Sequence, residues 1–189
     1  MQRETENEPM SESRLDIRAL QAPLKAAYRE DPETAIATMV VRSAARDLSN
    51  PLRCAISPDA APEIVWESGA HPGVGGAAGL PCSGDLLLGA LAACQEITVR
   101  MVAAAMGIEL EELEVVATGQ FDLRGTLGIS REAPVGLTTL RCDTRVKLAG
   151  DTDPERARRL LENAERYCVV LSTLRNGIAV ESTFALDGA

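Results

Sequence analysis

Apolar residues recur at helical spacing in two long stretches of the chain. In residues 83–106 and again in residues 157–171, the apolar stripe follows offsets of four, seven, eleven and fourteen residues. The pattern predicts two long helices, each with one cysteine on its inward face. The two stripes comprise Leu87, Leu91, Cys94, Thr98 and Met101, and Ala157, Leu161, Ala164, Cys168 and Leu171.

Residue types at the ends of these stretches define the expected helix bounds. Ser83 is suited to be the N-cap of the first helix, and Asp85 lies in the first turn, where the helix dipole favours an anion. Gly107 is a natural stop. Asp153 is the expected cap of the second helix, which we expect to run to residues 176–177.

Segments rich in β-branched residues lie outside the two helices and predict strands. Strands and helices occur in separate blocks instead of regular βαβ units, which predicts an α+β fold with antiparallel pairing. The Gly-rich segment 68–80 lacks the lysine of a phosphate-binding loop and is interpreted as a connection. The expected strands are residues 35–43, 52–57, 64–67, 114–123, 138–148 and 178–186.

The N-terminal part differs from the rest of the chain. Residues 1–13 are polar and charged, without periodicity, and residues 14–30 have apolar residues near helical spacing that Pro23 interrupts. We therefore expect an N-terminal arm over residues 1–34, partly disordered with a short helix, and one domain over residues 35–189.

Charge and composition narrow the classes of function. The 189 residues include 19 basic and 28 acidic side chains, for a net charge of −9, which disfavours binding to nucleic acid or to an anionic membrane surface. No stretch approaches 18 consecutive apolar residues, and the polar start has no signal-peptide pattern, so no membrane span or export is expected.

The chain has five cysteines, an odd number, and no two of them have C-x-x-C spacing. A secreted disulfide framework and a structural zinc site are therefore both poor interpretations, and we expect a cytoplasmic protein with reduced thiols. His71 is the single histidine, which leaves little for a histidine-based metal site. Neither a metal nor an organic cofactor is expected.

Cys94 and Cys168 allow two interpretations. Free cysteines are among the most buried residues, so both are suited to be small core side chains. If the two helices pack together, however, the two sulfurs meet. A cysteine pair with a nearby arginine has the parts for peroxide reduction, because one thiolate attacks the O–O bond and the second thiol condenses with the resulting sulfenic acid.

Three segments of the sequence resemble the OsmC/Ohr family of osmotically inducible and organic hydroperoxide resistance proteins, in particular its OsmC-like subgroup. They are GGAAGLPCSGDLLLGALAACQEIT, MVAAAMGIELEELEVVATGQFDLRGTLG and ERYCVVLSTLRNGIAVE, in this order. The resemblance implies an α+β fold with two long central helices packed with antiparallel sheets. It also implies an intertwined homodimer with its sites at the subunit interface, and thiol-dependent reduction of organic hydroperoxides or hydrogen peroxide.

Carried over to this chain, the resemblance implies that Cys94 is the peroxidatic cysteine and Cys168 the resolving cysteine. It also implies an arginine that holds the thiolate, for which Arg46 matches best and Arg53 and Arg42 are rivals. An external dithiol would supply electrons. Arginine suits this role because it stays charged and donates in several directions.

Two positions depart from the family pattern. Hydroperoxide-reducing members carry a Glu ten residues before the peroxidatic cysteine, where this chain has Gly84, and the nearest acid is Asp85. Relatives usually have Pro after the second cysteine, where this chain has Val169. Two other functions therefore stay open: a non-catalytic scaffold of this family that binds an apolar small molecule, and a thiol redox sensor.

Overall fold

The structure is a computed structural model that describes residues 15–44 and 47–186. The chain divides into two units between Ile36 and Ala37, two residues from the boundary expected from the sequence. The first unit contains α1 (Ile17–Glu30) and the 3-10 turn η1 (Pro32–Ala35). Asp16 caps α1, and Pro23 lies inside the helix, where the sequence predicted an interrupted helix.

The second unit begins with a three-stranded antiparallel sheet in the order β1-β2-β3. Its strands are β1 (Val41–Ser43), β2 (Arg53–Pro58) and β3 (Trp66–Gly69). The first strand is much shorter than the predicted 35–43, because only three of its residues pair with β2. A 3-10 turn, η2 (Pro72–Val74), interrupts the Gly-rich connection that follows β3.

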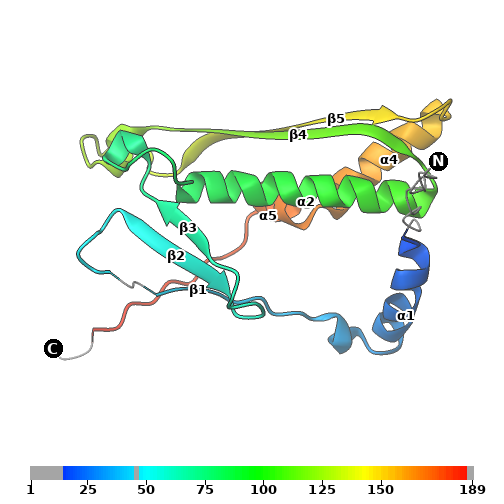
Figure 1. Ribbon diagram of the computed structural model, residues 1–189, viewed down its shortest axis with the longest axis horizontal. Coiled ribbons are helices and arrows are strands. Elements are labelled where there is room, and N and C mark those ends of the chain that lie inside the picture. The colour runs from blue at the N-terminus through cyan, green and yellow to red at the C-terminus, as the bar shows by residue number, and fades with distance from the viewer. Residues whose placement is uncertain (1–14, 45–46, 187–189) are drawn as a thin grey trace, which may run out of the picture. The chain divides into compact units, whose positions relative to one another are not determined.

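A long antiparallel hairpin forms the second sheet. Strands β4 (Leu110–Phe121) and β5 (Leu137–Leu148) pair along nearly their whole length, and the short helix α3 (Leu123–Thr126) lies in the connection. The hairpin runs along the long helix, as Figure 1 shows. Side chains alternate between partly buried and exposed along both strands, so one face of the hairpin packs on the helix.

Helix α2 (Ser83–Met106) is the centre of the core and packs against β4 on one side and against α4 and α5 on the other. Its N-cap is Cys82, with extended backbone angles, whereas Ser83, the expected cap, is already helical. Gly107 ends the helix in the left-handed conformation at φ 64°, as expected. By length and composition alone α2 is apolar enough to cross a membrane, a property that core helices share.

The second predicted helix is broken in two. Helix α4 (Pro154–Tyr167) begins after the expected cap Asp153, and α5 (Val169–Asn176) follows a break at Cys168, whose backbone is extended at φ −73° and ψ 105°. The break coincides with a Cys-Val-Val segment, whose residues are poor helix formers. The prediction of one continuous helix is therefore wrong.

The C-terminal strand expected at residues 178–186 is also not formed, because nothing in the described chain pairs with that segment. A strand requires a partner, and an apolar pattern alone does not supply one. Among the described residues, the most deeply buried side chains lie on α2 and α4 and at the break that follows α4. They include Leu91, Val99, Leu160, Ala164 and Cys168.

Candidate active site

The packing of α2 against α4 and α5 brings together the two cysteines that the sequence analysis selected. Cys94 lies in the middle of α2 and is partly exposed, whereas Cys168 lies at the break between α4 and α5 and is fully buried. Both are free thiols. The two thiols lie close enough for each to shift the pKa of the other.

The beginning of α5 lies beside the sulfur of Cys94. The backbone N–H groups of Val169 and Val170, which form the first turn of α5, lower the pKa of Cys94. The first N–H groups of a helix have no partner inside the helix, and they carry the positive end of its dipole. The break at Cys168 therefore creates an anion-stabilising helix end beside Cys94.

The two thiols differ in acidity as a result. Burial raises the pKa of Cys94, but hydrogen bonds from Val170 N–H, the Cys168 thiol and Val169 N–H together outweigh burial, so the net pKa is lowered. Thr98, whose hydroxyl donates to the Cys94 carbonyl oxygen at 2.7 Å, adds a smaller effect in the same direction.

Burial raises the pKa of Cys168, and the adjacent Cys94 raises that pKa further. The backbone N–H of Leu171 lowers it, but the net pKa is raised. Of the two thiols, Cys94 is therefore the more acidic and gives a thiolate more readily. A thiolate is the nucleophilic form of cysteine, and this asymmetry gives the two cysteines different chemical roles.

None of the three candidate arginines is found beside Cys94 among the described residues. Arg46 lies outside those residues. Arg53 is on β2 beside Leu80 and Glu67, near the start of α2, whereas Cys94 lies about 16 Å further along the helix axis from Ser83. The rival Arg42 forms an ion pair with Asp59 at 2.7 Å. The groups that lower the pKa of Cys94 in the described chain are thus neutral donors.

Asp85 is placed at the helix start. Its carboxylate accepts a hydrogen bond from the backbone N–H of Cys82 at 2.8 Å, which completes a capping box, and this bond lowers the pKa of Asp85. The residue lies nine positions before Cys94 on the same helix. In this chain it stabilises the start of α2.

The anion-stabilising start of α5 is the feature that sequence reasoning missed. The resemblance contained a signal for it, because relatives usually have proline after the second cysteine, and proline is favoured at the first position of a helix. Here Val169 occupies that position and keeps an N–H that proline lacks. Cys168 therefore ends one helix and precedes another, instead of lying within a continuous helix.

A third cysteine, Cys142 on β5, lies near the pair and contributes to the raised pKa of Cys168. Its own pKa is raised by burial and by Asp143. Among residues 15–44 and 47–186, no group of three or more His, Cys, Asp or Glu side chains is arranged to hold a metal ion.

Fold and site together define an α+β protein whose long core helix presents an acidified cysteine to a second, buried thiol. The chain belongs to the OsmC-like protein family, whose profile matches residues 76–183, more than half of the sequence. No curated protein sequence is significantly similar to it.

Solved structures share the fold at low sequence identity. The OsmC-like protein from Mycoplasma pneumoniae has a TM-score of 0.57 at 16% identity, covering 74% of this chain and 88% of that chain. An organic hydroperoxide resistance protein from Elizabethkingia anophelis has a TM-score of 0.54 at 17% identity, covering 74% and 89%. The organic hydroperoxide resistance protein OsmC from Legionella pneumophila has a TM-score of 0.53 at 16% identity, covering 74% and 90%. The family and the antiparallel α+β fold expected from the sequence are confirmed.

Proposed function

We propose that this protein is a thiol-dependent peroxidase that reduces organic hydroperoxides or hydrogen peroxide in defence against peroxide stress. The observation that carries the proposal is the position of Cys94, whose pKa is lowered by the first two N–H groups of α5 and by the adjacent thiol of Cys168. Membership of the OsmC-like family, and structural similarity to proteins named for organic hydroperoxide resistance, support the same chemistry.

The proposed reaction uses each cysteine once. The Cys94 thiolate attacks one peroxide oxygen, an S–O bond forms, the O–O bond breaks, and the other oxygen leaves and takes a proton to give an alcohol or water. Cys94 is then a sulfenic acid. The sulfur of Cys168 attacks it, an S–S bond forms, and water leaves. An external dithiol reduces the disulfide and returns both thiols.

The proposal includes a homodimer, for which exposed apolar side chains give support. Leu87, Ile97 and Met101 on α2 are between about 40% and 55% exposed in the single chain. The segment 178–186 pairs with no strand in the part of the chain that the structure describes, and it carries exposed Ile178 and Phe184. A second copy would bury this surface, because soluble proteins rarely expose large apolar patches without a partner.

The same proposal gives the charged residues of the expected site their roles. A guanidinium beside Cys94, from Arg46 or from Arg53 of a second copy, would add a permanent positive charge to the N–H donors of α5. Asp85 would orient that guanidinium in addition to capping α2. We place the protein in the cytoplasm, where thiols are kept reduced and its five free cysteines would persist.

The test is a count of free thiols after the reduced protein is mixed with tert-butyl hydroperoxide. Wild type should lose two thiols per chain in a rapid phase, and Cys94→Ser should lose none in that phase. Cys54→Ser is the matched control, because Cys54 is exposed but distant from the helix pair in the fold, and it should react like wild type. Equal, slow thiol loss in wild type and Cys94→Ser would contradict the peroxidase.

A further inference from the structure

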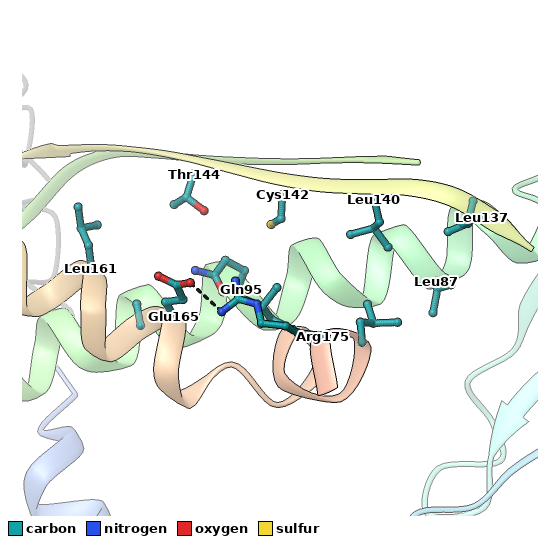
Figure 2. Close-up of a pocket in the computed structure, with 12 residues that line it drawn as sticks. Leu87, Gln95, Leu137, Leu140, Cys142, Thr144, Leu161, Glu165 and Arg175 are labelled. Atoms are coloured by element: carbon teal, nitrogen blue, oxygen red, sulfur yellow. Dashed lines mark ion pairs between the residues drawn. The ribbon is translucent and has the colours of Figure 1, made fainter. Parts of the chain in front are cut away.

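An ion pair joins the two helices that meet at Cys168. Arg175, in the last turn of α5, contacts Glu165, near the end of α4, with 2.8 Å between Nη1 and Oε1. Figure 2 marks this contact, and we call the two residues the α4–α5 clamp. They lie on opposite sides of the helix break, three residues before and seven residues after Cys168. Among the described residues, no other ion pair connects α4 to α5.

Apolar packing alone holds α5 weakly. None of its eight residues is buried in the chain that the structure describes. On the side of the helix that faces β5, a cavity of about 720 Å³ has Leu171 and Leu174 of α5 in its wall, with Leu140 of β5 lining it as well. Open space on this side means that close packing does not fix the helix there, so a polar contact with α4 matters more.

The orientation of α5 matters because its first turn lies beside the Cys94 sulfur. The backbone N–H groups of Val169 and Val170 lower the pKa of Cys94, and an N–H group has this effect only while it is aimed at the sulfur. Cys168 immediately precedes the same turn. A rotation of α5 about the break would therefore move both N–H groups and the second thiol relative to Cys94.

We propose that the α4–α5 clamp is a positioning pair: the contact between Glu165 and Arg175 fixes α5 against α4 and so keeps the first turn of α5 beside Cys94. The inference rests on the proposed peroxidase, whose nucleophile is the Cys94 thiolate. Glu165 and Arg175 act through α5 and take no part in bond making or breaking. Both side chains are more than half exposed, so the expected effect of the pair is modest.

The experiment measures alkylation of Cys94 by iodoacetamide as a function of pH in the full chain. Glu165→Gln removes the ion pair and should slow alkylation about twofold below the pKa of Cys94. Glu162→Gln is the matched control, because Glu162 lies one turn earlier on α4 and pairs with Arg158 of the same helix, and it should react like wild type. No peroxide is used, so this test and the test of the peroxidase can fail independently.

The sign of the change separates positioning from a direct effect of charge. By charge alone, removing the carboxylate of Glu165 would favour a thiolate at Cys94 and speed its alkylation. Displacement of the α5 N–H groups has the opposite effect. Slower alkylation of Glu165→Gln therefore supports the proposal, and faster or unchanged alkylation overturns it.

Arg175 provides the second half of the test. Arg175→Gln should slow alkylation as much as Glu165→Gln, whereas Arg175→Lys keeps a cation and should stay close to wild type. The double variant with Gln at both positions should be no slower than either single variant, because each removes the same contact. In 1 M NaCl, which screens exposed charges, the difference between wild type and Glu165→Gln should shrink. Circular dichroism establishes that each variant is folded, and additive slowing in the double variant would also overturn the proposal.

Discussion

The acidity of Cys94 can be tested by removing a single backbone donor. Replacing Val169 with Pro deletes one N–H that lowers the pKa of Cys94 and leaves the side-chain environment largely apolar. Val169 is the first residue of α5, where proline is favoured, and the extended backbone of Cys168 is compatible with a following proline. The substitution should therefore keep the helix and change only the donor.

The expected magnitude follows from the geometry. A hydrogen bond to a charged group contributes about 1.5–3 kcal/mol when both partners are desolvated. Cys94 is partly exposed and keeps the Val170 N–H, so we take about 1 kcal/mol for the lost bond. That free energy lowers the thiolate fraction about fivefold at any pH below the pKa of Cys94.

The assay is alkylation of Cys94 by iodoacetamide as a function of pH, with the Cys94 peptide quantified by mass spectrometry. Val169→Pro raises the pKa, so its rate curve should move to higher pH, with slower reaction below the pKa. The matched control is Ser83→Pro, which places proline at the first position of α2, away from the thiols. The reasoning is refuted if Val169→Pro leaves the curve unmoved, or if Ser83→Pro moves it equally.

Three further predictions concern stability, measured by urea unfolding. Gly84→Glu should raise the free energy of unfolding by about 1 kcal/mol, because a Cβ at this position meets only Cys82 Sγ at 3.4 Å and an anion is favoured in the first turn of a helix. A lower free energy of unfolding would contradict the space that the structure leaves for this side chain. Asp85→Asn should destabilise by about 0.5 kcal/mol at pH 7. Since folding lowers the pKa of Asp85, this difference should disappear as the pH falls through that pKa, and a difference that persists in acid would argue against the carboxylate cap. Leu160→Ala, at a fully buried position, should lower the free energy of unfolding by about 3 kcal/mol, whereas Leu161→Ala, at a half-exposed position, should lower it by less than about 1 kcal/mol. Equal losses for the two variants would contradict the assignment of Leu160 to the core.

The meeting of Cys94 and Cys168 was predictable because it depends on local periodicity. Each cysteine lies on an apolar stripe, and two such stripes bury their surfaces most readily against each other. The caps at Asp153 and Gly107 were predictable for the same reason, since each depends on a few adjacent residues. Family resemblance added the chemical roles of the two sulfurs, which periodicity cannot supply.

Features that depend on distant segments were not predictable in the same way. The segment 178–186 has a strand-like sequence but no pairing partner among residues 15–44 and 47–186, and strand formation requires one. The helix break at Cys168 interrupts a stripe that continues on both sides, so periodicity alone hides it. An arginine near Cys94 would have to come from another element, and sequence spacing does not determine such a contact.

The most direct test of the account is identification of the disulfide formed after one equivalent of tert-butyl hydroperoxide. Tryptic peptides of the oxidised, alkylated protein should show Cys94 linked to Cys168, with Cys54, Cys82 and Cys142 recovered as alkylated thiols. The account is contradicted if Cys94 and Cys168 are both recovered as alkylated thiols while peroxide is consumed, or if the peroxide is not consumed.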